Sequence, residues 1–499
     1  MASERQDAWK LGSGWNETLL WYAKAVVELK KLPITDRRSW RYLAAMHQFD
    51  RDLWIDLGII TATTALPPDE DTGIAWNQCQ HSSFYFLPWH RGYLARFEQI
   101  IAATIVSIKG KPGWKLPYWN YLDASNPDAR KIPGAFLEEF LPAPDGHVRN
   151  PLQDVPRFGQ KVLGPEPRLH IDDIDLAAMD ETDFTGSVSF GGSQTLFSNP
   201  ELGVRGQLEN VPHGSVHVLV GGARPAKPGN GYLSSFYTAG LDPLFWLHHC
   251  NIDRLWAAWM TKAGSNMESG KQWLDGPSGR AFAVPKLDGT DLENFTARDT
   301  LSGGKFHVGY DDLHAGTGVP VPPVGGVVVA TKQGPARMAE PQVIGANDEK
   351  VVLGNNPAET AVRLAPEAGG AVVAAMGPGA DMAAKAKRLF LKLENIRGVS
   401  TAGGLKAYVN LPVGQGSENL PQDRAAGSAA LFGLASASKT DGPHGGNGIT
   451  LVFDITDLAR RLIGLGDFDP EHLRVKIISA HEGGDADPVT IDRVSVLRD

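Results

Sequence analysis

The chain has 499 residues, enough for two or three domains, and its 42% hydrophobic and 21% charged residues are ordinary for a soluble globular protein. A net charge of −9 and a pI near 5.9 argue against a nucleic-acid or anionic-membrane partner, because both favour basic surfaces. The sequence shows no secretory leader, no apolar run of membrane-spanning length, and only two cysteines, Cys79 and Cys250. We therefore expect a cytoplasmic protein without a disulfide framework.

The first 260 residues are expected to be mainly helical. Apolar residues at three- and four-residue spacing predict a helix over 15–31 with Asn16 as its N-cap, and a second over 36–54 capped by Asp36. Pro88 suits the first turn of a third helix that continues to about residue 109. Two further helices are predicted over 206–220 and 243–262. The Pro-, Gly- and Asp-rich stretches between 110 and 205 are typical of loops that carry function or wrap a core.

The composition changes beyond residue 313. The segment 314–345 is rich in Pro and Gly and reads as a linker. Short strand-like runs separated by turn residues then predict an antiparallel β-sandwich; these runs are 388–399, 405–411, 449–455, 473–480 and 489–497. The expected fold is multidomain: a mainly α domain over 1–313, built as a four-helix bundle with long loops, then the linker and a β-sandwich over 346–499.

The histidines form two groups on or beside the predicted helices. The first group comprises His47, His81 and His90. In the second, His213 and His217 are four residues apart and share one helix face, and a His-His pair follows on the last predicted helix. Three imidazoles held by separate rigid elements are what a metal with an open coordination position needs. The sequence therefore predicts a pair of three-histidine metal sites acting on one ligand.

The ligand types narrow the choice of metal. A zinc-protease motif H-E-x-x-H would need Glu where this chain has Gly214. Neutral imidazoles without thiolate or carboxylate ligands suit copper or zinc.

The pair His248-His249 leaves a choice of ligand. Phe245, His249, Asp253 and Trp256 follow one face of the predicted helix. Asp253 is placed to accept a hydrogen bond from the outer nitrogen of a ligand histidine, as carboxylates often do around metals. We therefore assign the ligand role to His249 and a structural role to His248.

Four motifs in order, "SWRYLAAMHQFD", "CQHSSFYFLPWHRGYLARFE", "ENVPHGSVHVLVGG" and "DPLFWLHHCNIDRLW", make the chain resemble the type-3 copper proteins: tyrosinases, catechol oxidases and molluscan haemocyanins. The resemblance implies two copper ions with O2 bound between them. It implies that one copper is held by His47, His81 and His90, and the other by His213, His217 and His249.

Further roles follow from the same resemblance. Cys79, two before His81, matches a cysteine that forms a thioether to the histidine ring in fungal and molluscan members. Phe236 matches a residue that overhangs the second copper in plant enzymes, and Glu209 a glutamate that holds a water near the site as general base. Gly214 departs from bacterial tyrosinases that carry Asn after the histidine, which puts efficient monophenol hydroxylation in doubt.

The C-terminal part resembles the last domain of plant polyphenol oxidases in "KAYVNLP" and "TLVFDITDLARRL", and "GSAALFGL" is similar to a piece of the haemocyanin β-sandwich. In relatives of this layout the domain covers the copper site with an inserted side chain. The expected covering segment is 391–403, with Ile396 as the inserted residue; the alternative is a domain that serves only folding or oligomerisation. Tyr310 resembles a tyrosine that packs on an N-terminal arginine, and Arg37 or Arg38 is the expected partner.

Three functions remain open at this stage. A tyrosinase would act on monophenols and o-diphenols, which suits a chain without plastid or secretory targeting. A catechol oxidase would act on o-diphenols alone, which Gly214 favours. An oxygen carrier is disfavoured because the chain has no tandem repeat of units. The expected partners are small phenols and O2, with no nucleic acid and no membrane; homo-oligomerisation is left open, and melanin synthesis is the family's common role.

Overall fold

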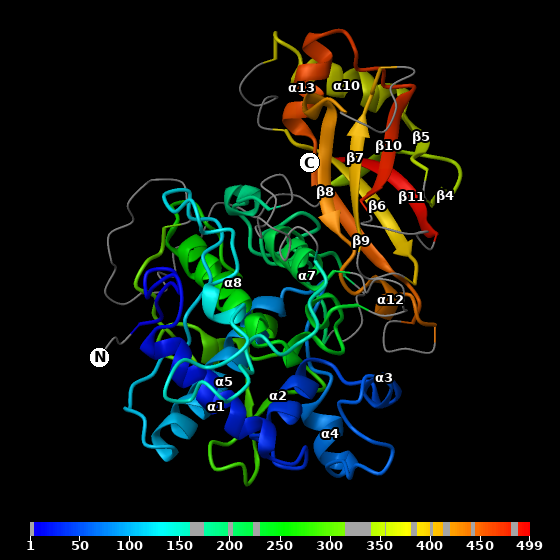
Figure 1. The fold of residues 1–499 in the computed structure, drawn as a ribbon. Helices are drawn as coiled ribbons and strands as arrows, with labels where there is room; N and C mark the ends of the chain where they lie inside the picture. The colour runs from blue at the N-terminus through cyan, green and yellow to red at the C-terminus, as the bar shows by residue number, and fades with distance from the viewer. Residues whose placement is uncertain are drawn as a thin grey trace.

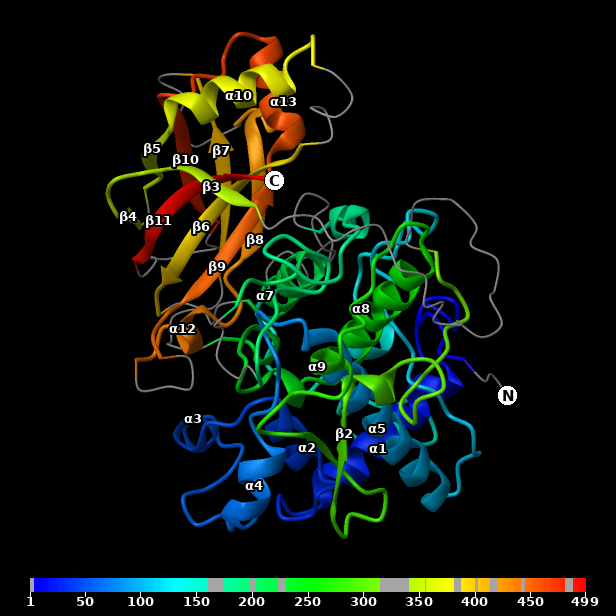
Figure 2. The ribbon, with the colours of Figure 1, turned by 180° about the vertical axis from the view of Figure 1, so that it is seen from behind.

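The structure is a computed structural model that describes residues 4–159, 174–197, 203–222, 230–314, 341–354, 356–380, 387–399, 403–412, 420–440, 445–480 and 488–499. A helical N-terminal domain carries a β-rich C-terminal domain on one side (Figures 1 and 2). Most of the predicted linker, residues 315–340, lies outside the described residues. Within the described ranges, no helix combines the length and the apolar character that crossing a bilayer requires.

The N-terminal domain is built on two long helices and several short ones. α5 and α8 pack against each other, and α1 packs on α5. A small hairpin of β1 and β2 completes the domain. The bounds are α1 Glu17–Lys31, α2 Trp40–His47, α3 Arg51–Asp56, α4 Asp69–Ala75, α5 Phe86–Ser107, α7 Ser215–Gly221, α8 Pro243–Thr261, α9 Lys271–Leu274, β1 Phe282–Pro285 and β2 Leu292–Phe295.

Helix capping explains where the predictions agree and where they fail. The Asn16 side chain accepts a hydrogen bond from the Leu19 N–H and starts α1, as predicted. The prediction of one helix over 36–54 is wrong. Ser39 caps α2, the chain turns extended at Gln48, and Asp50 caps α3 as a separate helix. Two capping residues within one apolar pattern divide it into two short helices, and the break leaves His47 at the end of α2.

The predicted helix over 206–220 is interrupted in the same way. Residues Glu209–Gly214 form a wide turn of π type, and regular α-helix resumes only in α7. Val211 has extended backbone angles, and Pro212 has no N–H to donate to a helix ladder. The interruption sets His213 on the wide turn and His217 on the regular helix that follows.

A buried charge network ties the N-terminus to the end of the domain. The Arg5 side chain donates to Glu98 at 2.8 Å and to the Tyr310 hydroxyl at 2.9 Å. The arginine partner of Tyr310 is therefore Arg5, and the expectation of Arg37 or Arg38 is wrong. Arg37 pairs with Asp71 instead, at 2.9 Å.

The C-terminal domain is an antiparallel sheet with helices packed beside it. Its elements are β3 Gln342–Ala346, β4 Val351–Leu353, β5 Ala358–Leu364, α10 Pro366–Met376, β6 Leu389–Arg397, β7 Gly404–Val409, β8 Ala425–Ala430, α12 Leu434–Ala437, β9 Ile449–Asp454, α13 Thr456–Gly464, β10 Leu473–Ala480 and β11 Val489–Arg498. The first strand, β3, begins within the predicted linker and ends one residue beyond it.

All described strand pairings in this domain are antiparallel, as predicted. The nine described strands form one connected sheet in the order β8-β7-β10-β5-β3-β11-β6-β9, with β4 on β11. The end strands β8 and β9 also lie close to each other, so the sheet nearly closes on itself. Two stacked sheets are thus not confirmed, nor is a four-helix bundle in the N-terminal domain.

Each domain has its own apolar core, and one residue of the second domain joins the first core. The sheet strands of the C-terminal domain surround an aliphatic core that includes Ile396. Phe432, in the turn between β8 and α12, instead packs into the aromatic core of the N-terminal domain and is 1% exposed. In both views this end of the sheet reaches the region of α7 (Figures 1 and 2).

Candidate metal centre

The first histidine group comes from three different segments. His47 is the last residue of α2, His81 lies in the loop before α5, and His90 lies in the second turn of α5. All three side chains are buried. The ring of His47 lies 5.7 Å from that of His81 and 6.0 Å from that of His90, between centroids, and His81 and His90 are 6.1 Å apart. The structure therefore brings together the three residues predicted for one site.

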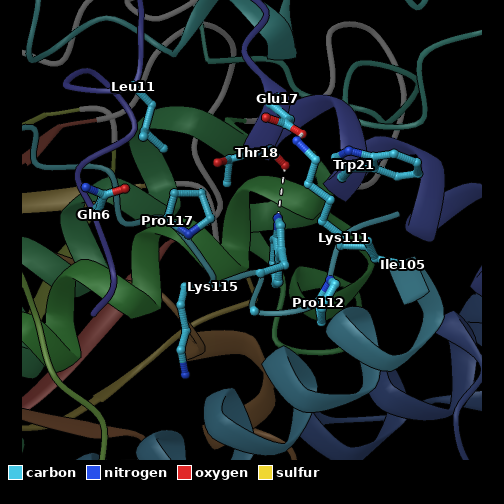
Figure 3. A pocket seen from close by; sticks show the side chains of 12 residues that line it. Gln6, Leu11, Glu17, Thr18, Trp21, Ile105, Lys111, Pro112, Lys115 and Pro117 are labelled. Atoms are coloured by element: carbon cyan, nitrogen blue, oxygen red, sulfur yellow. Dashed lines mark hydrogen bonds and ion pairs between the residues drawn. The ribbon is translucent and has the colours of Figure 1, made fainter. Parts of the chain in front are cut away.

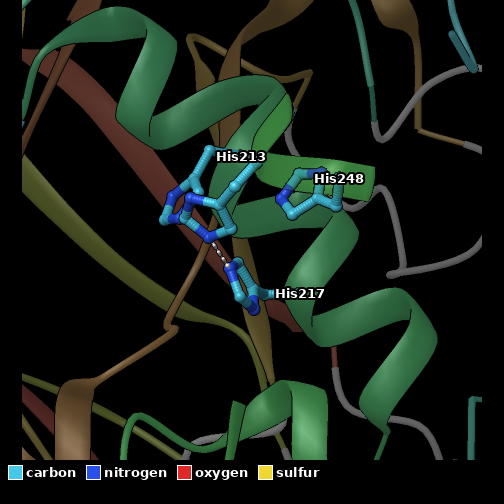
Figure 4. A group of neighbouring side chains, drawn as sticks. His213, His217 and His248 are labelled. Carbon is cyan, nitrogen blue, oxygen red and sulfur yellow. Dashed lines mark hydrogen bonds between the residues drawn. The ribbon is translucent and has the colours of Figure 1, made fainter. Parts of the chain in front are cut away.

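The second group lies on the wide turn, α7 and α8. The Nε2 atoms of His217 and His249 are 3.0 Å apart. The His213 ring lies 4.6 Å from that of His217 and 4.9 Å from that of His249. Figure 4 shows His213, His217 and His248 gathered together, and its dashed line marks the contact of His217 with His249. One ligand atom from each of these four histidines lies within 4.8 Å of the others.

The hydrogen bonds of the rings decide which nitrogen faces the pocket. A backbone carbonyl lies within 2.7–3.0 Å of Nδ1 in four of the six rings, so Nδ1 carries the proton there and Nε2 keeps its lone pair. These pairs are His47 with Phe236, His90 with Phe86, His213 with Glu209, and His217 with Leu233. The Nε2 atoms of His47 and His213 are buried and have no hydrogen-bond partner in the described structure. Buried acceptors of this kind fit a bound cation.

The two groups form one continuous cluster of rings. His90 stacks on His249 with 4.4 Å between ring centroids, and His81 lies 6.0 Å from His213. Burial lowers the pKa of every one of these imidazoles, to about 4 for His47. Neutral imidazoles in two adjacent sets of three suit a pair of late first-row metal ions such as copper.

His248 has a separate set of contacts. Its Nδ1 lies 3.1 Å from the Tyr121 hydroxyl, and its ring stacks on His213 at 5.5 Å. Burial lowers its pKa to about 3. The hydrogen bond to Tyr121 gives this imidazole a partner away from the other rings, whereas His249 has its Nε2 directed at His217.

The expected role of Asp253 is wrong. Its carboxylate does not accept from His249, whose Nδ1 has no hydrogen-bond partner among the described residues. It accepts instead from Arg91 at 2.6 Å, from Tyr310 at 2.5 Å and from Arg5 at 3.4 Å. Sequence periodicity placed Asp253 on the same helix face as His249. It could not show that the partners of its carboxylate are Arg5, from the N-terminus, and Arg91, from α5.

Cys79 lies against the first group. Its sulfur is 3.4 Å from Nδ1 and 3.7 Å from Nε2 of His81, and 3.4 Å from Nε2 of His90. The ring carbon Cε1 of His81 is bonded to both of its nitrogens, so this carbon lies within reach of the sulfur.

Glu209 and Arg205 form a buried charged pair beside the histidines. Both carboxylate oxygens of Glu209 accept from the Ser82 backbone N–H, each at 3.0 Å. The Nε of Arg205 lies 3.6 Å from Oε1 of Glu209, and both side chains are 1% exposed. Arg205 was missed in the sequence because its only signal is a charge four residues before Glu209.

Two aromatic rings close the pocket. Phe236 stacks on His81, with 4.1 Å between centroids and 11° between planes, and lies 6.1 Å from the ring of His47. It therefore lies against the first histidine set, and the expectation that it overhangs the second site is wrong. Phe432 stacks on His217 at 4.0 Å and 12°, and its edge meets Phe236 at 4.4 Å. It also lies 5.8 Å from His213. The residue that the C-terminal domain inserts among the histidines is therefore Phe432.

The prediction of Ile396 as the inserted residue is wrong, because Ile396 is buried in the core of its own sheet. The sequence did contain a feature that could have identified the inserted residue: Phe432 is an aromatic residue followed by glycine in "ALFGL". Gly433 has a left-handed φ of +81°, and an added Cβ would lie 2.0 Å from the Phe236 ring. Gly214 also faces this segment: an added Cβ would lie 3.7 Å from Cβ of Ala430 and 4.0 Å from Cβ of Phe432.

Polar contacts hold the two domains together around Phe432. The carbonyl oxygen of Phe432 accepts from Nη2 of Arg205 at 2.7 Å. The hydroxyls of Tyr237 and Ser436 are 3.0 Å apart. Farther away, Arg388 donates to both oxygens of Glu181, at 3.0 and 2.9 Å.

A surface cavity of about 280 Å³ lies between α1, the end of α5 and the segment 111–117 (Figure 3). It is lined by Trp21 and Trp114, and Lys111 on its rim pairs with Glu17 at 3.2 Å. None of the histidines lines it, so it is separate from the metal centre.

Comparison with known proteins gives two family matches. Residues 37–262 match the common central domain of tyrosinase, and residues 340–499 match a domain of unknown function (DUF7868). Tyrosinase HcTyr1 of Hahella sp. (strain CCB-MM4) is 30% identical over 514 residues, which cover 99% of this chain and 98% of that protein. The chloroplastic catechol oxidase B of Solanum tuberosum is 35% identical over 205 residues, 39% of this chain and 33% of its own length.

Two solved structures share the fold over nearly the whole chain. Latent apple tyrosinase (MdPPO1) superposes with a TM-score of 0.59 at 20% identity, covering 99% of this chain and 96% of its own. Recombinantly expressed latent aurone synthase, a polyphenol oxidase, gives 0.59 at 19% identity and covers 99% and 89%. The helical domain followed by a β-rich domain is thus a polyphenol-oxidase fold.

Proposed function

The chain belongs to the tyrosinase family of copper oxidoreductases, and we propose that it hydroxylates monophenols at the ortho position and oxidises o-diphenols to o-quinones with O2. The observation that carries this proposal is the single buried cluster formed by two sets of three histidines, with Glu209 beside it. The first set, His47, His81 and His90, would hold one copper ion, and the second set, His213, His217 and His249, would hold the other. When bound, the two copper ions supply the activation of O2 and the electron transfer.

The protein's own groups would position the phenol and take its proton. The backbone carbonyls that accept from Nδ1 fix the orientation of four imidazoles. The Glu209 carboxylate, fixed by the Ser82 N–H, is placed to take the phenol proton, directly or through a water. Phe236 would form one wall of the substrate pocket, and its stacking on His81 places that wall beside the first histidine set.

A catechol oxidase limited to o-diphenols is the second candidate, because Gly214 offers no side chain to orient a water beside Glu209. The position of Gly214 supplies a different reason for a small residue there. An added Cβ would already touch Ala430 and Phe432, so a larger side chain would compete with the C-terminal domain for this space. The glycine is therefore compatible with both activities.

We further propose that the C-terminal domain is a lid that keeps the enzyme latent. Phe432 fills the space beside His217 and Phe236 that a phenol ring would need. A substrate ring can replace Phe432 only when the domain moves, so acid, detergent or cleavage within 315–340 would activate the enzyme.

We also propose a thioether between Cys79 and His81. The S–C bond would form at Cε1 as the S–H and C–H bonds break, and O2 would accept the two electrons and two protons. The distances of 3.4 and 3.7 Å from the sulfur to the two ring nitrogens support this choice of atom. Small phenols and O2 would be the partners of the enzyme, a cytoplasmic location stays a prediction, and quinone products would suit melanin-type polymerisation.

The test is oxygen uptake by the copper-loaded full-length chain, with tyramine and with 4-methylcatechol in parallel, before and after brief acid or protease treatment. Uptake with both substrates supports the tyrosinase proposal. Uptake with the catechol alone would make the protein a catechol oxidase. Reversible O2 binding without consumption of either substrate would instead support an oxygen carrier. Equal rates before and after treatment would refute the lid.

A further inference from the structure

The inserted residue resembles a substrate in more than its ring. The Phe432 ring stacks on His217, and the Phe432 carbonyl oxygen accepts from Nη2 of Arg205 at 2.7 Å. In a phenylalanine residue the ring and the carbonyl carbon are joined through Cβ and Cα. A phenol with a propanoate side chain has the same connectivity between its ring and its carboxylate. A ring placed where the Phe432 ring lies would therefore bring that carboxylate to Arg205.

Arg205 is held in place independently of Phe432. Its Nε lies 3.6 Å from Oε1 of Glu209, a residue of its own domain that is itself fixed by the Ser82 N–H. The guanidinium can thus stay beside the pocket when the lid opens. A planar fork of donors in a site of low dielectric is the preferred protein partner of a carboxylate.

The positions directly after two of the second-set histidines carry no cation. The residues that directly follow the second-set histidines His213 and His217 are Gly214 and Val218, and neither carries a charge. Arg205 comes from the segment before the wide turn, and its Nε lies 3.6 Å from Oε1 of Glu209.

We propose that Arg205 is a specificity-determining residue that binds the carboxylate of phenolic substrates with a two-carbon side chain, the class of hydroxyphenylpropanoates and of tyrosine-like amino acids. This inference rests on the proposed function, because it assigns the substrate class of the same site. In the latent enzyme the Phe432 carbonyl takes the place of that carboxylate. A substrate with an alkyl tail would displace this oxygen without replacing it, which costs the hydrogen bond.

The first experiment compares two catechols that differ only in the tail: 3-(3,4-dihydroxyphenyl)propanoate and 4-ethylcatechol. The copper-loaded, acid-activated full-length chain and its Arg205→Met variant would be assayed with both. We expect the ratio of kcat/KM for the acid over the alkyl catechol to fall about tenfold or more in Arg205→Met, as for a lost hydrogen bond to a charged group. Arg205→Lys should restore part of the ratio, because it keeps the cation. A variant that is damaged generally loses both rates alike and leaves the ratio unchanged.

Arg388→Met is the matched control, since it removes an arginine from the domain contact far from the histidines. It should leave the ratio as in the parent chain. An unchanged ratio in Arg205→Met would overturn the inference, while 4-ethylcatechol turnover in the same assay still tests the proposed oxidase activity by itself.

A second readout needs no turnover. 3-Phenylpropanoate has no phenol to oxidise, and by competing with Phe432 it should favour the open lid. In the full-length chain it should therefore raise hydrogen exchange over 425–437, whereas 3-phenylpropanol should not. The rise should be absent in Arg205→Met. Equal effects of the acid and the alcohol would overturn the inference even if the chain oxidises no catechol.

Discussion

Replacing Phe432 by alanine should convert the latent chain into a constitutively active one. The side chain is 1% exposed and stacks on His217 at 4.0 Å. Replacing a buried phenylalanine by alanine costs about 3 kcal/mol of stability at the lower end of the measured range. That energy now favours the closed lid, and every 1.4 kcal/mol is about tenfold in an equilibrium. The fraction of open lid should thus rise about a hundredfold.

The assay is o-diphenol oxidation by untreated chain, divided by the rate of the same preparation after acid activation. We expect this quotient to be small in the parent chain and to approach one in Phe432→Ala. Phe468→Ala is the control, because Phe468 is a nearly buried phenylalanine in the core of the C-terminal sheet. A parent-like quotient in Phe432→Ala would refute the reasoning, and an equal rise in Phe468→Ala would assign the activation to general loosening of the domain.

Three substitutions and one mass measurement test separate parts of the molecule. Gly214→Asn should raise the ratio of tyramine to 4-methylcatechol turnover and also lower latency, because its side chain meets the segment of Phe432; a parent-like value of both would contradict this. Glu181→Gln removes the carboxylate charge that Arg388 contacts at 3.0 and 2.9 Å. It should raise the o-diphenol oxidation rate of the untreated chain, most clearly at low salt. An unchanged rate would show that this ion pair does not help to hold the C-terminal domain in place. The thioether predicts a peptide containing Cys79 that is lighter by a pair of hydrogen atoms and resists alkylation, and a fully alkylated Cys79 in copper-loaded protein would rule it out. Burial raises the pKa of Asp7 from 3.8 to about 6, so this carboxyl binds its proton more tightly in the folded chain and destabilises the fold as pH rises from about 4 to about 6. Asp7→Asn should therefore stabilise the chain more at pH 7 than at pH 4, by up to about 3 kcal/mol of unfolding free energy, seen as a larger rise in Tm at pH 7. Equal gains at both pH values would disprove this.

The six histidines could be selected from the sequence because local spacing carries much of the information. His213 and His217 are four apart, and each remaining histidine lies on or beside a predicted helix. The structure gathers all six in one buried cluster, as the motifs led us to expect. The break between α2 and α3 was also readable in principle, since Ser39 and Asp50 are both good N-caps.

The contacts that failed to emerge from the sequence are long-range. Arg5 and Tyr310 are 305 residues apart, and no periodicity links them. Phe432 reaches His217 only because one end of the sheet docks beside α7, and strand patterns say nothing about docking. The sequence also favoured Ile396, an aliphatic residue in a strand, although alternation there buries it in its own sheet.

The burial of the histidines sets an order of assembly. In the described structure the six histidines are between 0% and 3% exposed, and the Phe432 ring stacks on His217. A hydrated ion arriving from solution has to shed its water and reach these nitrogens, which a closed lid prevents. Copper must therefore enter before the C-terminal domain docks, or while that domain is transiently detached from the histidines. If this contact restrains catalysis as proposed, it also keeps loaded metal from escaping, so metal retention and latency should rise and fall together across variants of the C-terminal domain contact.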